Sequence, residues 1–239
     1  MNRNYSYLKK VLDEWNFSLS DTQYNQLDLF YELLIEKNKV MNLTAITEFD
    51  EVLVKHFADS LSICTALPDG INSVCDLGTG AGFPGIPMAI AYPDIQFTLI
   101  DSLNKRIKFL QEVVDALGLK NVTLIHSRAE EAGRNKAYRE QFDLVVSRAV
   151  ANIATLSEYC LPLVKVGGYF ISFKSGDIKE EIDASGTAVK KLGGRMNEPT
   201  YFMLPDTDIN RSFIIVNKEK NTPKAYPRKA GTPSKEPLK

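Results

Sequence analysis

The sequence predicts an α/β fold: a Rossmann-like, doubly wound sheet, mostly parallel, with a terminal antiparallel hairpin and an amino-terminal helical extension. Three observations predict it. From residue 73 onward, short apolar runs alternate with helical patterns, a glycine-rich turn follows the first run, and the last two runs have no helical pattern between them. With 239 residues, 44% of them hydrophobic, the chain can bury the core of one such domain.

Residues 1–70 are expected to form a helical extension that packs on the main domain. After the candidate cap Ser20, apolar residues recur at three- and four-residue spacing and predict an amphipathic helix ending near Asn38: Leu27, Phe30, Tyr31, Leu34 and Ile35. A second helical pattern follows Asp50 and is stopped by Pro68-Asp69-Gly70. No linker rich in Pro, Gly or Ser follows, so we do not expect a separate domain.

Residues 71–220 are expected to form the main domain. The pattern predicts strands at 74–77, 97–101, 122–126, 144–147 and 168–174, with helices at 85–91, 104–117, 153–163 and 179–192. Strands and helices that alternate in this way imply a parallel sheet with right-handed crossovers. Two final strands, at 200–204 and 213–218, would close it as a hairpin. That ending resembles the class I methyltransferase version of the doubly wound sheet rather than the dehydrogenase version.

A glycine loop after the first strand, at residues 76–85, is the sharpest local signal. Its glycines, among them Gly78 and Gly80, allow a tight turn in which the backbone can approach a ligand at the carboxyl edge of the sheet. Phe83 stands where a dinucleotide fingerprint has its third glycine, which weakens an NAD interpretation. The alternative is a plain turn between strand and helix.

Asp101 adds to this signal. It ends the second strand, 23 residues after Gly78, where an acidic side chain can accept hydrogen bonds from ribose hydroxyls. The alternative role is a helix cap, because the next helical pattern starts just after it. The combination of loop, strand end and acid favours an adenosyl ligand.

Further candidates follow the third and fourth strands on the same edge. Ala129 is small enough to border an adenine ring, and Glu130 is either a neighbour of the ligand or a solvent-facing residue at a helix start. Arg148 would meet the carboxylate of the ligand or an RNA phosphate, with a structural salt bridge as the alternative.

Composition narrows the classes of function. Three scattered cysteines and two histidines indicate neither a disulfide framework nor a metal site. No run is apolar and long enough to cross a bilayer and no signal peptide is recognisable, so we expect a cytoplasmic protein without membrane contact. The net charge is −1, yet residues 218–239 carry seven Lys or Arg and two Glu. The basic, Pro-rich tail at 221–239 is either an RNA-contacting arm or a solvated chain end.

Two motifs that are typical of particular reactions are absent from the sequence. No Asp/Asn-Pro-Pro-Tyr/Phe motif follows the fourth strand, as methylation of an exocyclic amine would require, and no Pro-Cys pair suggests covalent attack on a pyrimidine. A purine ring nitrogen with its own lone pair would need no strong base, and alignment of the reactants would supply most of the catalysis.

Several ordered motifs cover nearly the whole chain: Asn42-Leu43-Thr44, His56 with Asp59-Ser60, the loop at 76–84, Asp101-Ser102-Leu103-Asn104-Lys105-Arg106, Ser147-Arg148-Ala149, Leu161-Pro162-Leu163, Tyr226-Pro227-Arg228-Lys229-Ala230-Gly231-Thr232-Pro233 and Lys235-Glu236-Pro237-Leu238. Together they resemble the glucose-inhibited division protein B family, bacterial methyltransferases that modify small-subunit ribosomal RNA.

The resemblance implies transfer of a methyl group from S-adenosylmethionine to nitrogen-7 of a guanine in 16S rRNA, either naked or in the small ribosomal subunit. It implies that Gly78, Phe83, Ala129, Glu130 and Arg148 bind the cofactor; the glycine loop and the acid at the end of the second strand add Gly80 and Asp101. No catalytic residue is assigned, although Arg148 is a candidate substrate contact. A metal-free monomer is expected.

Two alternatives of other classes remain at this point. An NAD-dependent oxidoreductase would share the sheet, the loop and the ribose acid. A non-catalytic RNA-binding assembly factor would use the basic tail alone. His56 and Asp59, three residues apart on a predicted helix, would either face the substrate or form a structural pair.

Overall fold

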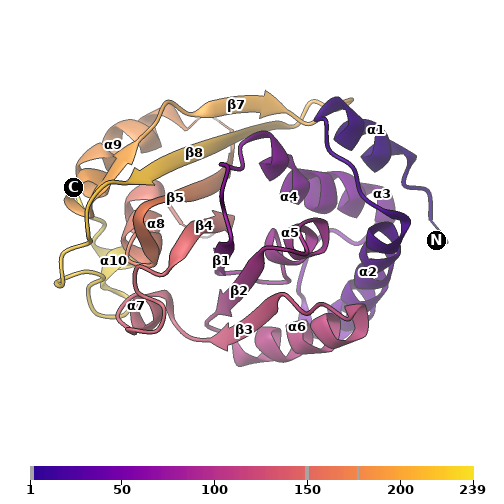
Figure 1. The fold of residues 1–239 in the computed structure, drawn as a ribbon, viewed down its shortest axis with the longest axis horizontal. Helices are drawn as coiled ribbons and strands as arrows, with labels where there is room; N and C mark the ends of the chain where they lie inside the picture. The colour runs from indigo at the N-terminus through magenta and orange to yellow at the C-terminus, as the bar shows by residue number, and fades with distance from the viewer. Residues whose placement is uncertain (1–2, 149–150, 177) are drawn as a thin grey trace.

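In the computed structural model, which describes residues 3–148, 151–176 and 178–239, an eight-stranded sheet separates two groups of helices (Figure 1). Its first five strands run parallel in the order β3-β2-β1-β4-β5 and comprise β1 (Ser73–Leu77), β2 (Gln96–Asp101), β3 (Val122–His126), β4 (Phe142–Arg148) and β5 (Val164–Ser175). Each predicted parallel strand is thereby confirmed.

The sheet ends in antiparallel strands, as the sequence predicts. β8 (Asn210–Lys218) pairs with β5, and both β7 (Thr200–Met203) and the short β6 (Gly194–Met196) pair with the other edge of β8. The β7–β8 hairpin confirms the predicted ending. β6 was not predicted, because three residues that begin with Gly194 give no apolar alternation to recognise.

The amino-terminal helices cover one face of the sheet. They comprise α1 (Ser6–Glu14), α2 (Asp21–Met41), α3 (Phe49–Val52), the π-helical turn η1 (Leu53–Ala58), α4 (Asp59–Leu61) and the 3₁₀ turn η2 (Ser62–Thr65). Ser20 caps α2 in a capping box with Gln23, which confirms the predicted start. The predicted second helix is the run from α3 to η2. α1 was not predicted as a separate element.

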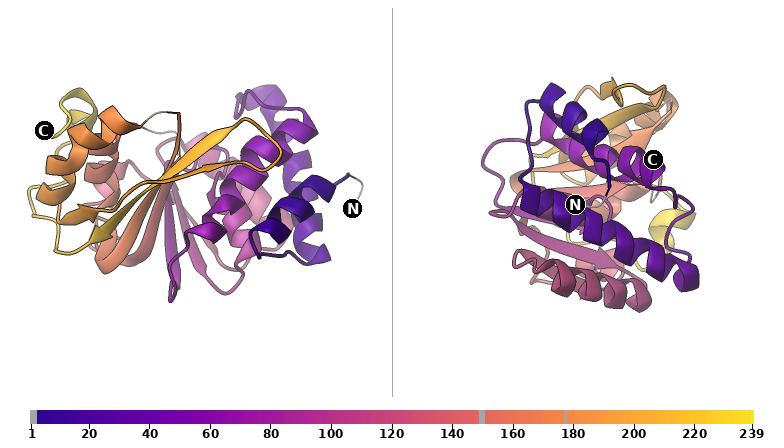
Figure 2. Two further views of the ribbon diagram at one scale, coloured as in Figure 1. Left: turned by 90° about the horizontal axis from the view of Figure 1, so that it is seen from above. Right: turned by 90° about the vertical axis from the view of Figure 1, so that its right-hand side faces the viewer.

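The remaining helices lie on both faces of the sheet, as Figure 2 shows edge-on. α5 (Gly85–Ala91) and α6 (Asn104–Leu117) share the face of the amino-terminal helices, whereas α8 (Ile153–Cys160) and α9 (Lys179–Lys191) cover the other. Two short helices, α7 (Ala129–Ala132) and α10 (Thr232–Lys235), lie beside α8. The predicted helices are confirmed, with ends that differ by a few residues.

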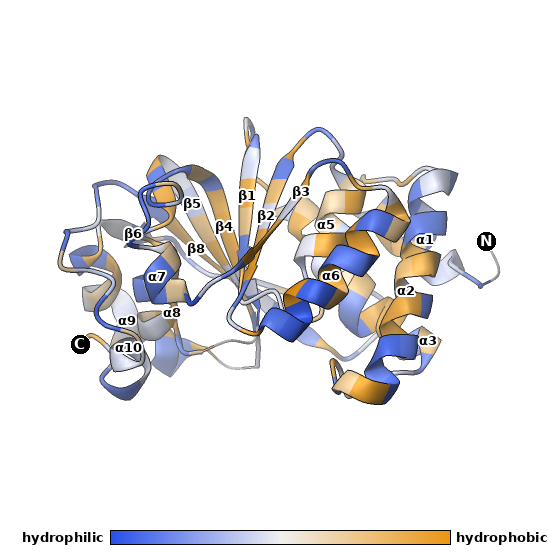
Figure 3. Ribbon diagram, turned by 90° about the horizontal axis from the view of Figure 1, so that it is seen from below, coloured by the Kyte–Doolittle hydropathy of each residue, from blue (hydrophilic) through white to orange (hydrophobic). Residues whose placement is uncertain are grey.

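Two apolar cores lie on opposite faces of the sheet. Successive strand residues alternate between them: Val146 belongs to the core under α5 and α6, and Val145 to the core under α8 and α9. Figure 3 shows the hydrophobic strands in the middle of the molecule and hydrophilic residues on the outer turns of helices such as α6. The helices before β1 share the first core, for example through Phe30 and Phe57, so they pack directly on the sheet domain.

The carboxyl-terminal tail is folded against the domain. Thr222, Pro233 and Leu238 are buried, and α10 contacts α8. A solvated chain end is therefore not what the structure shows.

Candidate functional site

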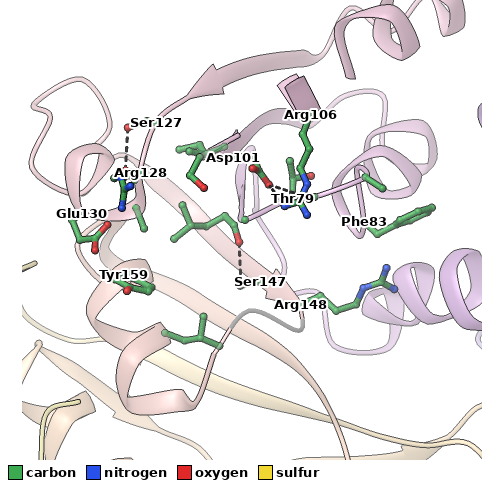
Figure 4. Close-up of a pocket in the computed structure, with 18 of the residues that line it drawn as sticks. Thr79, Phe83, Asp101, Arg106, Ser127, Arg128, Glu130, Ser147, Arg148 and Tyr159 are labelled. Atoms are coloured by element: carbon green, nitrogen blue, oxygen red, sulfur yellow. Dashed lines mark hydrogen bonds and ion pairs between the residues drawn. The ribbon is translucent and has the colours of Figure 1, made fainter. Parts of the chain in front are cut away.

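A pocket of about 640 Å³ opens where β1 to β4 end at their carboxyl ends (Figure 4). This volume lies within the usual range for small-molecule sites. All seven residues that the sequence proposes for the cofactor line it: Gly78, Gly80, Phe83, Asp101, Ala129, Glu130 and Arg148. The register of the parallel strands brings them together, since Asp101 pairs with His126 and Leu77 with Ile100. Their contacts with a ligand stay a prediction.

The glycine loop holds its shape through its own amides. Gly78 and Thr79 donate from their backbone N–H to Ile100 O, at 2.8 and 3.2 Å, and Gly80 N donates to Asp101 Oδ2 at 2.9 Å. Gly78 and Gly80 have φ of +77° and +63°, a conformation that glycine adopts without strain. These three loop amides are thus bound within the protein, which fixes the shape of the loop.

Asp101 is the centre of this arrangement. Its side chain is buried and accepts from Gly80 N, from Leu103 N at 2.8 Å and from Arg106 Nη1 at 3.2 Å. Leu103 is the N-cap of α6 and no side chain caps this helix, so the alternative role of Asp101 as a helix cap is wrong; Asp101 instead binds the backbone N–H of the residue before the helix. One carboxylate therefore fixes the glycine loop and the residue before α6 while it lines the pocket.

Asp76, the first residue of the predicted glycine loop, lies under that loop. It is fully buried and accepts from Gly85 N at 2.9 Å, which anchors the start of α5. Burial raises the pKa of Asp76 to about 6. A Cβ at Gly85 would lie 2.6 Å from Asp76 Oδ2, so glycine is required by close approach at this position.

Glu130 lies at one end of the pocket, beside Tyr159 (Figure 4). It is only 6% exposed, so the alternative of a solvent-facing residue is wrong. Its Oε1 accepts from the backbone N–H of Gly231 at 2.7 Å. Gly231 and Ser234, from the carboxyl-terminal tail, line the same pocket and were not predicted, because no local pattern links a tail to a site about a hundred residues away.

Arg148 lies at the opposite end of the pocket, beside Phe83 (Figure 4). Its Nη1 donates to Asp59 Oδ2 at 2.7 Å, and its guanidinium lies 5.2 Å from the centre of the Phe83 ring. The structural salt bridge that the sequence left open is thus present, on a side chain that also faces the pocket. Ala149, the next residue of the predicted motif, lies outside the described residues.

His56 and Asp59 meet through Arg148. Asp59 accepts from both Arg148 and Arg211, whereas His56 Nδ1 lies 3.5 Å from Arg148 Nη2 and its ring stacks on Phe83 at 4.5 Å. Burial, with the nearby Arg148 charge, lowers the pKa of His56 to about 4, so the imidazole is neutral at pH 7.

The motif Asn42-Leu43-Thr44, to which the sequence assigned no role, reaches the pocket through its last two residues. Thr44 Oγ1 lies 2.9 Å from His56 Nε2, and Thr44 and Leu43 both line the pocket.

A second pocket, of about 460 Å³, adjoins the first and shares His56 and Arg148 with it. Four cationic side chains and two carboxylates line it: Lys55, Arg148, Lys174 and Arg211, with Asp59 and Glu181. It lies at the carboxyl ends of β4 and β5, to which Arg148 and Lys174 belong. The wall between the two pockets is therefore a neutral histidine and an arginine.

The described residues hold neither a membrane-spanning helix nor a cluster of metal ligands. No helix in the described part of the chain is long and apolar enough to span a membrane. Within the same residues, no three or more His, Cys, Asp or Glu side chains gather as metal ligands would.

Comparison with known proteins gives a consistent result. The family model for rRNA small subunit methyltransferase G matches residues 23–207. Ribosomal RNA small subunit methyltransferase G of Lachnoclostridium phytofermentans is 52% identical over 238 residues, which cover 99% of this chain and 98% of the relative. The enzyme of the same name from Clostridium perfringens is 48% identical over 98% of this chain and 99% of its own.

Solved structures resemble the chain in fold alone. The TYW2 protein of M. jannaschii in complex with AdoMet has a TM-score of 0.52 and 14% identity, covering 72% of this chain and 77% of that one. A SAM-dependent methyltransferase from Aquifex aeolicus has a TM-score of 0.50 and 18% identity, covering 70% of this chain and 92% of its own.

Proposed function

The chain belongs to the rRNA small subunit methyltransferase G family, and on that premise we propose that it transfers the methyl group of S-adenosylmethionine to nitrogen-7 of a guanine in 16S rRNA. Family membership decides between the enzyme classes that the sequence left open, and the nicotinamide alternative is not retained. The observation that carries the proposal is a ligand-sized pocket at the strand ends joined, through His56 and Arg148, to a second pocket rich in cations.

The residues of the first pocket fit the cofactor. A Cβ built on Gly80 meets nothing closer than 3.9 Å, so the backbone there faces open space that a ligand can approach. Asp101 and Glu130 supply carboxylates to a site for a cationic ligand with ribose hydroxyls. We propose that the loop at Gly78 and Gly80 borders the amino-acid end of the cofactor, Asp101 its ribose, and Ala129 with Glu130 its adenine.

The second pocket suits the RNA. Lys55, Lys174 and Arg211 lie where a substrate would meet the cofactor, and phosphate groups are bound by such cations. Each of them is paired with a carboxylate, of Glu51, Glu181 and Asp59 respectively, so a phosphate would compete with these ion pairs. Because Arg148 faces both pockets, it is the candidate contact with the target nucleotide.

Methyl transfer to a ring nitrogen that carries a lone pair requires no proton transfer by a side chain. When bound, S-adenosylmethionine would supply a methyl group attached to a sulfonium. The acceptor nitrogen would form the new bond with its own lone pair, while the methyl–sulfur bond breaks and the sulfur keeps its electron pair as a neutral thioether. No proton has to be removed, so no general base is needed. The protein has to bind both reactants and align them, which is worth roughly 7–11 kcal/mol of barrier when well arranged. The neutral His56 keeps further positive charge away from a cationic donor.

Transfer of labelled methyl from S-adenosylmethionine tests the proposal. Both 16S rRNA and small subunits, taken from cells that lack the gene, are incubated with the protein, and the label is mapped by strand cleavage specific for 7-methylguanine. Label at one guanine supports the proposal and shows which form is the substrate. Label on another atom would correct the target, and no label on either form would refute the activity.

The RNA contact has its own test. Lys55→Ala removes a partly exposed cation from the second pocket and should flatten the slope of log affinity for 16S rRNA against log salt by about one unit. The matched control is Lys190→Ala, an exposed lysine of α9. Equal slopes for both variants would remove the second pocket from the RNA site.

We further propose that the enzyme acts as a monomer in the cytoplasm, where ribosomal subunits are assembled. Light scattering on the purified protein tests the first statement, and cell fractionation tests the second.

A further inference from the structure

The carboxyl-terminal tail is held by polar contacts as well as by apolar burial. Arg134 Nε donates to Pro227 O at 2.9 Å, and Arg139 Nη1 donates to Tyr226 O at the same distance. Thr155, on α8, donates from Oγ1 to Pro233 O at 3.1 Å. Cations of the domain thus bind carbonyl oxygens of the tail, although the tail itself is basic by composition.

One ion pair fixes the tail to α8. Arg228 and Glu158 face each other with two parallel hydrogen bonds, Nε to Oε1 at 2.9 Å and Nη2 to Oε2 at 2.7 Å, and Arg228 N also donates to Oε1 at 2.7 Å. The Glu158 side chain has no exposed surface. A buried carboxylate that is bound on both oxygens by one arginine specifies a single position for the tail.

Beyond this ion pair the tail reaches the pocket at the strand ends. Gly231 N donates to Glu130 Oε1 at 2.7 Å, and Gly231 and Ser234 line the pocket beside Tyr159. Gly231 has φ +82°, which suits glycine at the turn into α10. In Figure 1, α10 lies next to α7 and α8, the elements that carry Glu130 and Tyr159.

We propose that residues 228–234 form one wall of the S-adenosylmethionine site, positioned by the Arg228–Glu158 pair, so that docking of the tail and binding of the cofactor favour each other. This inference rests on the proposed function. It assigns a role to residues beyond 207, where the match to the family model ends. It also makes the tail a part of the cofactor site and not a free RNA-binding arm.

The coupling between tail and cofactor depends on the carboxylate of Glu130, which binds the tail and also lines the pocket. Glu130 is oriented by the Gly231 amide, and without the tail it would turn toward water and leave that end of the pocket open. A ligand that requires the closed wall then binds more weakly to the undocked protein. Reciprocity requires that the ligand hold the tail in place by the same factor.

Titration calorimetry with S-adenosylmethionine on the full chain tests the inference. Arg228→Ala leaves Glu158 buried without its partner and should undock the tail, which should raise the Kd by at least about fivefold. Lys224→Ala is the matched control: it removes the same charge from an exposed residue of the tail outside residues 228–234 and should leave the Kd within about twofold. Equal Kd values for a folded Arg228→Ala variant and the wild type would overturn the inference.

Two further measurements test whether the tail forms a wall of the cofactor site, even if Arg228→Ala does not fold. In the wild type, S-adenosylmethionine should slow hydrogen exchange of the Gly231 amide, whereas an unchanged rate would contradict the coupling. Ser234→Trp changes an exposed residue at the pocket rim and should weaken binding by blocking the wall, whereas unchanged affinity would remove the tail from the site. A wild type that does not bind S-adenosylmethionine would refute the proposed function itself.

Discussion

Replacing Asp101 with alanine should loosen the glycine loop and weaken cofactor binding together. The substitution removes the acceptor of two backbone amides, Gly80 N and Leu103 N, at 2.9 and 2.8 Å. A hydrogen bond to a charged group contributes about 1.5–3 kcal/mol. Because water from the pocket can replace part of the loss, we expect the free energy of unfolding to fall by about 2–4 kcal/mol. The partly exposed Arg106 adds little to this figure.

The same substitution removes the proposed partner of the ribose hydroxyls. We expect cofactor affinity to fall by about 1.5–3 kcal/mol, roughly one to two powers of ten in Kd. Urea unfolding followed by circular dichroism measures the first effect, and titration calorimetry with S-adenosylmethionine measures the second. Asp101→Asn is the control, because it keeps the shape and one acceptor oxygen and should lie between wild type and alanine in both measurements.

Each half of this reasoning can fail separately. If Asp101→Ala unfolds at the same urea concentration as the wild type, the carboxylate does not hold the loop. If stability falls while affinity stays unchanged, Asp101 is a structural residue only and leaves the cofactor site.

Three further predictions concern the residues around the loop. Gly85→Ala should lower stability by about 1–3 kcal/mol, because the new Cβ would lie 2.6 Å from Asp76 Oδ2, and an unchanged Tm would show that the turn has room. Burial raises the pKa of Asp76 from 3.8 to about 6, so the folded state binds a proton more tightly and this residue lowers stability as pH rises from about 4 to 6. The lowered pKa of His56, about 4, has the opposite sign and raises stability between about pH 4 and 6.5. The free energy of unfolding, measured with urea, should therefore rise relative to the wild type in Asp76→Asn as pH increases from about 4 to 6. In His56→Asn it should fall relative to the wild type as pH increases from about 4 to 6.5. A variant whose pH profile runs parallel to that of the wild type would contradict the prediction made for it.

The elements that the sequence predicted well are those with a strong local signal. The parallel strands β1 to β5 are apolar runs separated by helices with clear starts and ends, such as α2 after Ser20 and α6 before Gly118. Apart from α1, which has nine residues, the elements that it missed are short: α7, α10 and β6 have three or four residues each. Their conformation depends on what packs against them, and such context leaves no periodic pattern in the sequence.

For the pocket residues too, the sequence predicts some features and only the structure shows the others. Gly78, Phe83, Asp101 and Arg148 could be placed at one sheet edge from the chain alone, because parallel strands bring their carboxyl ends together. The sequence could not show that Asp101 binds the loop amides or that Arg148 binds Asp59, 89 residues away. For Arg148 the structure shows the salt bridge that the sequence gave as the alternative, whereas Asp101 does not cap α6; both side chains line the pocket.

By itself the sequence determined the doubly wound sheet, the position of the glycine loop and the family, since these depend on patterns within single elements or on ordered motifs. Only the tertiary structure decided that the basic tail packs on buried Glu158 and borders the pocket at Glu130. The reason is physical: the composition of a segment predicts its average affinity for water, whereas its place in the fold depends on the particular buried carboxylates and carbonyl oxygens that bind it.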